Sequence, residues 1–527
     1  MLPLIPMPNG KADVKTQRIE LPPVLRIDPG DFPWDFIGVY ARRAGIGIGA
    51  EGAAMLRVSR GAGLPPEAYR LRASTGGIEI EAADERSLCW ALATLAALTE
   101  NGSVPRCEIE DAPRFAHRGF MMDCARHFFP LATVKTMIEL LSMAKANVFH
   151  WHLTDDQGWR VESRRFPALQ AQNTAPGEYY TQEEIREAVE FARVRGVEII
   201  PEIDLPGHAT ALLAAYPQLS CSGKQVRVDS TPGIRAVILC PGKEAVFGFL
   251  FELLEEIAAL FPSRRVHLGG DEAPKGEWGK CPHCRRRMEA EGLANLEELQ
   301  GWFTARLAAR LRGCGKQVIC WNESLLSERL PRDVTDLAIQ YWAEVSKVGP
   351  ARRFWENGGG MIFSDQFRAY LDLAYGTVTL KKAYSYEPGV LGFTGKGLPA
   401  PRQARLDAAV LGLETCLWSE FVSTAEQLAV QAFPRAYAIA EAAWTQPARK
   451  DYKNFRRRLD AWLRKYPGIG FYPPEKADPG LIARYKGRIA FLRKQARALD
   501  KDNQNNAGLG GRLHWRYLLR WLRNYFF

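Results

Sequence analysis

Two adjacent carboxylates, Asp271 and Glu272, directly follow the short stretch VHLGG, which we interpret as the end of a buried strand. Successive side chains of a strand point to opposite faces, but the chain turns where a strand ends, so both acids can reach one site. Two close carboxyl groups repel each other, which separates their protonation behaviour. One can stay protonated as an acid while the other stays charged, and hydrolysis of a glycosidic bond needs this division. We therefore interpret the pair as a catalytic acid with a charged partner, and not as an ordinary surface turn.

Tryptophans close three further apolar runs, at Trp321, Trp342 and Trp418. A pyranose ring presents apolar C–H faces that pack on an aromatic plane, while its hydroxyls bind carboxylates and arginine. A single tryptophan is more often part of a core than of a site. Three at the ends of runs, beside acidic residues, instead predict the walls of a binding site for one sugar.

The residues with this chemistry follow apolar runs that alternate with helical stretches between residues 114 and 447. We expect eight strands, at Gly119–Asp123, Val148–Leu153, Val197–Ile203, Val266–Gly269, Val318–Trp321, Leu337–Tyr341, Met361–Ser364 and Leu411–Leu417. Between them we expect helices at Leu131–Lys145, Thr181–Arg195, Lys243–Leu260 and Leu296–Arg312. Alternating strands and helices predict parallel βα units, and eight such units predict a (β/α)8 TIM barrel in the α/β class. In that fold the active site lies at the carboxyl ends of the strands.

Polar residues at the ends of the predicted strands agree with this placement. Arg126 follows the first strand, Tyr370 and Asp372 follow the seventh, and Glu420 follows the eighth. The second and third strands lead into His150, His152, Asp155, Asp156, Glu202, Asp204 and His208. If the barrel forms, these side chains converge on one end of it, together with the carboxylate pair and the tryptophans.

Two further regions flank the predicted barrel. Residues 1–113 contain the β-like runs Ala54–Val58 and Gly77–Ala82 and the helical stretch Glu85–Glu100, which predict a small α+β domain. Residues 448–527 have a helical pattern and are rich in aromatic residues. From Asp451 onward the chain has 18 Lys and Arg against 6 Asp and Glu, within a net charge of +10 for the whole chain. We interpret this surplus as solvated helix faces; the amphipathic segment Arg512–Phe527 leaves binding to a membrane surface open as a minor alternative.

Composition and the N-terminal sequence restrict the class of protein. The balance of 46% hydrophobic and 25% charged residues is that of a globular protein with a sizeable core. The basic surplus lies in the tail and not around the predicted site, so we expect no nucleic-acid partner. The first residues lack the pattern of a signal peptide, and no stretch approaches the ~20 apolar residues of a membrane span. We expect a cytoplasmic protein with no membrane partner, whose oligomeric state is open.

Ten cysteines are scattered along the chain, and we expect them to be free thiols. Cys281 and Cys284 form a CxxC pair around His283, in KCPHC. A structural zinc site needs four ligands, and no second pair stands at a helpful spacing in the sequence. We therefore assign no metal and no cofactor to the chain, and leave open whether this pair binds a metal.

Seven segments resemble the motifs of glycoside hydrolase family 20, and they occur in order around the predicted barrel. They are HRGFMMDCARHFFP (117–130), NVFHWHLTDDQGWR (147–160), EIDLPGHA (202–209), HLGGDE (267–272), QYW (340–342), AYLD (369–372) and LWSE (417–420). The resemblance covers about residues 115–445, and the region before it is similar to the small α+β domain that precedes the barrel in this family. It implies an exo-acting β-N-acetylhexosaminidase, which removes terminal β-linked N-acetylglucosamine or N-acetylgalactosamine from a glycan.

The resemblance also implies a mechanism and the residues that perform it. In this family the 2-acetamido oxygen of the substrate attacks the anomeric carbon and forms an oxazolinium ion, and the reaction retains configuration. By the matching positions, Glu272 would protonate the leaving oxygen and later activate water. Asp271 would orient the acetamide N–H and balance positive charge, and Tyr370 would hydrogen-bond the acetamide from another side.

By the same resemblance, Arg126 would bind hydroxyls of the terminal sugar, with Asp372 and Glu420 binding hydroxyls on its far rim. The three tryptophans, Trp321, Trp342 and Trp418, would enclose the acetamide. Asp155, His208 and His152 would support the catalytic acid from behind. With side chains at the rim of the terminal sugar, no space remains there for a further sugar, which implies cleavage at chain ends.

Alternatives to this interpretation remain open in the sequence. A metal-dependent barrel hydrolase could use His150, His152, Asp155 and His208 as ligands, but it leaves the tryptophans and the carboxylate pair unexplained. A non-catalytic sugar-binding protein would keep the aromatic residues and lose the acid, whereas Glu272 is present. Within the family, a relative that releases a disaccharide or a sulfated sugar is also compatible with the motifs, as is either gluco or galacto preference.

Overall fold

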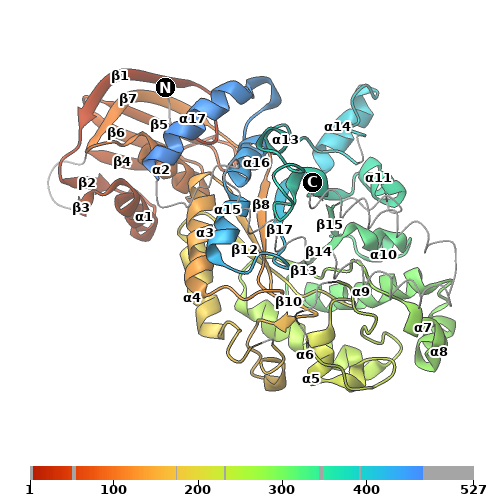
Figure 1. The fold of residues 1–527 in the computed structure, drawn as a ribbon. Helices are drawn as coiled ribbons and strands as arrows, with labels where there is room; N and C mark the ends of the chain where they lie inside the picture. The colour runs from red at the N-terminus through yellow and green to blue at the C-terminus, as the bar shows by residue number, and fades with distance from the viewer. Residues whose placement is uncertain are drawn as a thin grey trace.

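The computed structural model describes residues 4–49, 55–173, 175–228, 230, 233–342, 348–390 and 393–466. In this part of the chain a seven-stranded sheet with two helices precedes a closed barrel of eight parallel strands (Figure 1). The predicted fold class, a (β/α)8 barrel after a small α+β domain, is confirmed. Of the predicted basic region 448–527, the described part ends at residue 466 and includes helix α17 (Tyr452–Lys465). The segment Arg512–Phe527 lies outside the described residues.

The N-terminal domain is a mixed sheet with the helices α1 (Trp34–Ala44) and α2 (Glu85–Leu98). Its strands stand in the order β1 (Ala12–Glu20), β7 (Ser103–Asp111), β5 (Tyr69–Ser74), β6 (Gly77–Ala82), β4 (Leu56–Arg60), β2 (Val24–Asp28) and β3 (Gly47–Gly49). Alternate residues of β5 are buried, as expected for a strand with one covered face. Helix α2 begins where Asp84 and Ser87 form a reciprocal capping box, and it packs on β5 and β6.

Each of the eight predicted strand segments of the barrel overlaps one observed strand. The strands are β8 (His117–Asp123), β9 (Val148–His152), β12 (Glu198–Glu202), β13 (Arg265–His267), β14 (Gln317–Trp321), β15 (Ala338–Tyr341), β16 (Gly360–Phe363) and β17 (Val410–Leu417). They pair in parallel in sequence order, and β8 pairs with both β9 and β17, which closes the barrel. All eight strands therefore end at the same rim.

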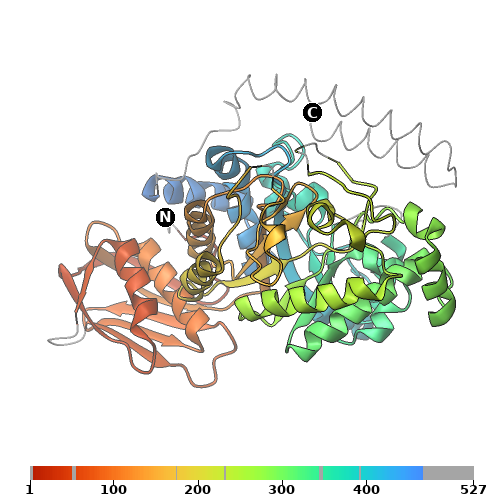
Figure 2. The same ribbon diagram turned by 90° about the horizontal axis from the view of Figure 1, so that it is seen from below.

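Helices cover the outside of the barrel, as Figure 2 shows from a second direction. They include α3 (Leu131–Met143), α4 (Gln182–Arg193), α6 (Glu244–Leu260), α9 (Leu296–Gly313), α11 (Val348–Glu356), α14 (Ala400–Ala409) and α16 (Arg435–Trp444). In α4 the buried residues Ile185, Ala188 and Ala192 are three or four positions apart, so one stripe faces inward. Within the described ranges, none of the helices has an apolar stretch long enough to cross a bilayer.

The N-terminal domain joins the barrel at the amino ends of β8 and β9, far from the rim that carries the acidic residues. Glu67 of the N-terminal domain accepts hydrogen bonds from Arg118 and, at 3.0 Å, from the Asn147 amide. The indole N–H of Trp90 in α2 donates to the same carboxylate at 2.8 Å. The buried Glu67 carboxylate thus connects the N-terminal domain to the amino ends of β8 and β9.

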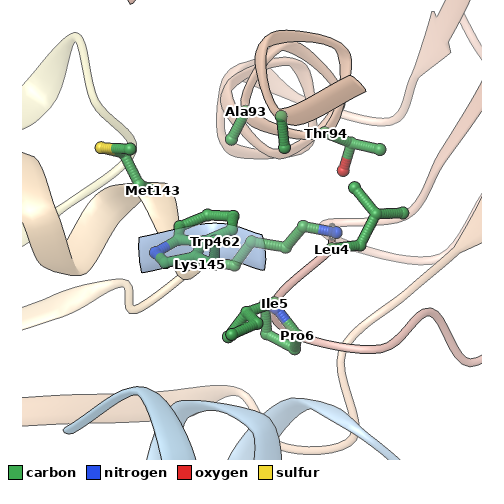
Figure 3. A pocket seen from close by; sticks show the side chains of 9 residues that line it. Leu4, Ile5, Pro6, Ala93, Thr94, Met143, Lys145 and Trp462 are labelled. Atoms are coloured by element: carbon green, nitrogen blue, oxygen red, sulfur yellow. The ribbon is translucent and has the colours of Figure 1, made fainter. Parts of the chain in front are cut away.

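A second buried carboxylate strengthens this joint through Lys145. The Lys145 ammonium lies 2.7 Å from Asp111 Oδ2 and donates to the Tyr69 hydroxyl at 2.8 Å. Figure 3 shows Lys145 beside Trp462 of α17 and close to Thr94 of α2, where three parts of the chain meet. Burial lowers the pKa of Lys145, and the Asp111 charge opposes that shift. The pair is almost completely shielded from water, so loss of one partner leaves a buried charge.

We expect the Lys145→Met substitution to destabilise the protein by about 3–5 kcal/mol, because it leaves the Asp111 carboxylate buried without its counter-ion. Urea unfolding followed by tryptophan fluorescence measures this loss. Lys135→Met is the matched control, since Lys135 pairs with the exposed Glu187 on the surface, where loss of an ion pair costs less than about 1 kcal/mol. Equal losses in the two variants would contradict the role assigned to Lys145.

Candidate active site

A tight turn after β13 delivers the predicted carboxylate pair to the rim. Gly269 and Gly270 have φ values of +64° and +96°, which side chains other than glycine rarely adopt. A Cβ at Gly269 would lie 1.7 Å from Asp204 Oδ1, so only glycine lets Asp204 approach this backbone. The Gly270 N–H donates to Asp204 Oδ1 at 3.0 Å, and the Gln300 amide donates to the Gly270 carbonyl at 2.7 Å. The hydrogen bonds to Asp204 and Gln300 thereby fix the backbone from which the Asp271 and Glu272 side chains project.

Asp271 and Glu272 both face the imidazole of His208. His208 Nε2 lies 3.9 Å from Asp271 Oδ2 and 3.8 Å from Glu272 Oε2. The Asp271 side chain is 12% exposed and that of Glu272 is 34% exposed, so Glu272 is the more accessible acid. Glu272 and His208 both have left-handed backbones, with φ of 46° and 47°. Such strain costs a residue other than glycine about 1–3 kcal/mol and tends to occur at functional sites.

Asp155 connects His208 to the rest of the rim. Its Oδ1 lies 3.1 Å from His208 Nδ1, and its Oδ2 lies 2.9 Å from His152 Nε2 and 2.8 Å from Arg126 Nη2. Burial raises the pKa of Asp155, but Arg126 and His208 outweigh burial and hold it below its usual range. Burial likewise lowers the pKa of His208, but the Asp155 charge outweighs it and holds that pKa well above its usual range. A positively charged imidazole therefore faces the carboxylate pair.

Below the rim, alternating imidazoles and carboxylates occupy the interior of the barrel. His152 Nδ1 lies 2.5 Å from Glu202 Oε2, and His150 Nε2 lies 3.0 Å from the same oxygen. His150 Nδ1 lies 2.8 Å from Glu414 Oε1, and His117 Nε2 lies 2.6 Å from Glu414 Oε2. We call this series, from His117 through Glu414, His150, Glu202, His152 and Asp155 to His208, the axial column.

The surroundings of His150 and His152 in the axial column favour charged imidazoles, whereas burial lowers the pKa of His117, whose Nδ1 lies 3.0 Å from the Arg265 guanidinium. A carboxylate only accepts hydrogen bonds, and both nitrogens of His152 hydrogen-bond carboxylates, so this ring donates twice. His150 donates from Nδ1 to Glu414, while its Nε2 faces Glu202 at 3.0 Å without a hydrogen bond. Burial lowers the pKa of His150, but Glu414 and Glu202 raise it to about 9. Burial also opposes protonation of His152, while Glu202 and Asp155 raise its pKa to about 10. Gly119 makes room for this arrangement, because a Cβ there would lie 2.1 Å from Glu414 Oε2.

The structure brings the predicted aromatic residues together on one side of the rim. Trp342 and Tyr370 stack with ring centroids 6.3 Å apart, and Tyr370 lies 6.1 Å from Trp418. Trp321 lies 5.9 Å from Trp418 and is completely buried, with its indole N–H donating to Glu202 at 2.8 Å. Burial raises the pKa of Tyr370 well above its usual value, with Cys416 and Asp271 adding to the shift, so Tyr370 stays a phenol.

Arg126 and Glu420 lie on the other side of Trp418. The Arg126 guanidinium sits over the Trp418 ring at 4.8 Å from its centroid. Burial raises the pKa of Glu420, and the Arg126 charge opposes that shift. Asp372 is buried and lies two residues after Tyr370. Its segment pairs with β17, because Leu371 N donates to the Cys416 carbonyl at 2.7 Å. All the predicted site residues thus lie at one end of the barrel.

Comparison with protein families decides which family this architecture belongs to. Residues 115–447 match the model of the glycosyl hydrolase family 20 catalytic domain, and residues 39–112 match that of glycosyl hydrolase family 20, domain 2. The chain belongs to glycoside hydrolase family 20. The catalytic-domain match includes every residue of the predicted site.

Several family 20 proteins are similar over most of the chain. A β-hexosaminidase of Porphyromonas gingivalis is 35% identical over 447 residues, which cover 79% of this chain and 56% of that protein. The chain likewise spans 64% of a β-hexosaminidase from Vibrio furnissii, so it is shorter than these two relatives. A β-N-acetylhexosaminidase of Cellulomonas fimi is 31% identical over 82% of this chain and 86% of its own length.

Solved structures of family 20 proteins have the same fold. A β-N-acetylhexosaminidase of Bacteroides fragilis superposes with a TM-score of 0.79 at 31% identity, covering 90% of this chain and 98% of its own. A family 20 exo-β-N-acetylglucosaminidase of Vibrio harveyi, solved in complex with N-acetylglucosamine, has a TM-score of 0.78 at 31% identity, with 90% and 78% covered.

The alternative of a metal-dependent hydrolase depended on His150, His152, Asp155 and His208 as one ligand set. In this family 20 chain both nitrogens of His150 and of His152 lie within 3.0 Å of carboxylates that only accept hydrogen bonds. A histidine nitrogen that carries a proton for a hydrogen bond has no lone pair left to bind a metal. Among the described residues these four do not form one ligand set: His150 groups with Glu202 and His267, His152 with Asp155 and Asp204, and His208 with Asp155 and Asp156.

Some residues that position the family 20 site were not predicted from the sequence. Asn322 Oδ1 accepts from the Trp342 N–H at 3.0 Å, and Glu323 Oε2 accepts from its indole N–H at 2.8 Å. Asp123, which the sequence had placed at the end of the first strand, accepts from Ser419 N at 2.9 Å and so connects the ends of β8 and β17. The sequence signal that could have identified Asn322 and Glu323 as site residues was their position, as a polar pair directly after Trp321.

The axial column predicts how stability depends on pH. A histidine with a raised pKa stabilises the fold fully below its unfolded pKa of about 6.5, and this contribution is lost as pH rises through the folded value. We expect the melting temperature of the wild type to fall between about pH 6.5 and pH 9, since the pKa of His150 is raised to about 9. The His150→Gln variant should melt at a lower temperature at pH 6 and show a shallower fall.

Differential scanning fluorimetry across this pH range measures both slopes. The prediction concerns the slope and not the absolute melting temperature, so a uniform loss of stability in the variant does not obscure it. Parallel curves for the two proteins would show that His150 is neutral in the folded state.

Proposed function

We propose that this family 20 protein is an exo-acting β-N-acetylhexosaminidase that cleaves terminal β-linked N-acetylglucosamine or N-acetylgalactosamine with retention of configuration. The observation that carries the proposal is the state of Asp271. Its Oδ1 is buried and has no hydrogen-bond partner among the described residues, although a buried carboxylate oxygen normally has one. The N–H of a substrate acetamide supplies that donor, and Tyr370 lies close enough to sense the Asp271 charge.

In the proposed reaction, Asp271 aligns the acetamide so that its carbonyl oxygen bonds to the anomeric carbon as the glycosidic C–O bond breaks. The nitrogen gains positive charge as the oxazolinium ring forms, and the adjacent Asp271 carboxylate stabilises that charge. The Tyr370 hydroxyl, held as a neutral phenol, donates a hydrogen bond to the acetamide from the aromatic side. Trp342 and Trp418 flank Tyr370 and exclude water from the amide.

Glu272 handles the proton in this proposal. It is the more exposed of the two acids, so it can reach the leaving oxygen and then the incoming water. Glu272 gives its proton to the leaving oxygen, and in the second step it takes a proton from the water that attacks the anomeric carbon. The His208 imidazolium, 3.8 Å away, stabilises the carboxylate that exists between the two steps.

Exo-action follows from the proposed role of the residues on the far side of Trp418. We infer that Arg126, Glu420 and Asp372 bind the hydroxyls of the terminal sugar. Arg126 is held by Asp155 at 2.8 Å and by Asp123 at 3.4 Å, so it cannot swing aside to admit another sugar. The relative from Vibrio harveyi is named an exo-β-N-acetylglucosaminidase and binds N-acetylglucosamine, which supports the same sugar class here.

Substitution of the two acids tests the mechanism. We expect Glu272→Gln to lower kcat by about 10²–10⁴-fold on natural linkages, because the general acid is lost while the binding residues stay. Asp271→Asn should lower kcat by a similar factor and also weaken a thiazoline, whose ring resembles the oxazolinium ion. Steady-state kinetics and inhibitor titration give both values. Near-normal turnover by Asp271→Asn would exclude participation of the acetamide.

A panel of aryl glycosides tests the substrate class. We expect hydrolysis of the β-N-acetylglucosaminide or the β-N-acetylgalactosaminide and none of the β-glucoside, since a 2-hydroxyl cannot form the cyclic intermediate. Thiazoline should inhibit every substrate that is turned over. Ready hydrolysis of the plain glucoside, or release of a disaccharide from a longer substrate, would contradict the proposed activity.

A further inference from the structure

Four cysteines from three separate segments meet beside the active-site rim. They are Cys221, Cys240, Cys281 and Cys284, and their sulfur atoms all lie within 4.8 Å of one another. Sulfur–sulfur distances are 3.8 Å for Cys221–Cys284, 3.8 Å for Cys240–Cys281 and 3.6 Å for Cys240–Cys284. The CxxC pair, which lacked a second pair in the sequence, thus gains two partners 41 to 63 residues away.

From this geometry we propose that the four cysteines bind one Zn²⁺ ion as a structural tetrathiolate site. Zinc binds thiolates at about 2.3 Å, and four ligands at that distance in a tetrahedron have sulfurs about 3.8 Å apart. The three sulfur–sulfur distances, 3.6 to 3.8 Å, agree with that value. A disulfide needs sulfurs about 2.05 Å apart, so these contacts do not represent two disulfides.

The surroundings contain two groups that stabilise thiolates. Cys281 is the N-cap of α8 (Pro282–Glu291) and Cys284 lies in its first turn, where free backbone N–H groups stabilise negative charge. Lys243 follows Cys240 closely, and its ammonium donates to the Ser220 carbonyl, next to Cys221, at 2.6 Å. Cys221 is partly exposed while the other three cysteines are buried, which leaves one side for entry of the ion.

Backbone packing shows that the chain is built to bring the two pairs together. A Cβ at Gly242 would lie 2.3 Å from the backbone nitrogen of Cys284, so only glycine permits this approach. The Cys240 N–H donates to the Leu219 carbonyl at 2.9 Å, which joins the segments of Cys221 and Cys240. Among the described residues, this is the one candidate ligand group composed entirely of cysteines.

The proposed zinc site lies between the two loops that carry the candidate catalytic residues. Leu239, next to Cys240, donates its N–H to the Pro206 carbonyl at 3.2 Å, two residues before His208. The Leu239 carbonyl accepts from the Trp278 indole at 2.8 Å, in helix α7 (Gly276–Lys280). That helix begins four residues after Glu272 and ends directly before Cys281. The ion would therefore hold the Glu272 and His208 loops in a fixed relation, without touching substrate.

Metal analysis of the full-length protein tests the proposal directly. We expect about one zinc per chain by inductively coupled plasma mass spectrometry after extensive dialysis. A mercurial thiol reagent should release it in proportion to modification of the four clustered thiols, after the exposed Cys314 has reacted. Protein produced with Co²⁺ in place of Zn²⁺ should show the charge-transfer and visible bands of a tetrahedral cobalt–thiolate centre. Absence of stoichiometric metal, a stoichiometric metal other than zinc, or disulfides among these four cysteines would overturn the proposal.

Variants separate this site from general effects of cysteine loss. Cys240→Ser and Cys281→Ser should each lower zinc content at least fivefold and lower the melting temperature, whereas Cys314→Ser, an exposed cysteine outside the cluster, should change neither. If the first two variants do not fold, the thiol-release stoichiometry of the wild type still decides the matter. Zinc content unchanged in soluble Cys281→Ser would contradict the assignment. None of these readouts depends on the proposed hydrolase activity.

Discussion

The axial column is the constraint on which the rest of the structure depends. A barrel interior is normally filled by apolar side chains in layers, but here histidines and carboxylates alternate from His117 to His208. Each buried charge is tolerable only because its neighbours carry the opposite charge and supply hydrogen bonds. The series ends at His208, whose outer nitrogen faces Asp271 and Glu272. Neutralising His150 or His152 would leave the carboxylates beside it unbalanced.

This arrangement explains why the rim can hold so many acids at close range. Asp155, Asp204, Asp271 and Glu272 lie around one imidazole, and the pKa of Asp204 is raised first by burial and then by the Asp271 charge. Positive charge from His208 and Arg126 offsets their mutual repulsion. The two catalytic candidates are thereby held in different surroundings: the Asp271 side chain is 12% exposed and that of Glu272 is 34% exposed.

The positions of the remaining parts are consistent with this division of roles. The N-terminal domain is attached at the amino ends of the strands by the buried Glu67 and Asp111, so it stiffens the end opposite the rim. The four-cysteine cluster lies at the rim and joins the loops of His208 and Glu272. Backbone strain at those two residues, with φ near +47°, needs such support from neighbouring structure.

The sequence by itself determined the elements, because apolar periodicity, caps and glycines act between near neighbours. The eight barrel strands, helices such as α4 and α9, and the carboxylate pair after VHLGG were all predictable. The sequence also placed Arg126, Tyr370 and Glu420 at strand ends, from which the barrel brings them to one rim. Only the tertiary structure decided what depends on the path of long loops. The pairing of Cys221 and Cys240 with the CxxC pair, and the position of His150 between Glu202 and Glu414, join residues 41 to 264 positions apart. No local pattern encodes such contacts, since they exist only once the barrel has closed.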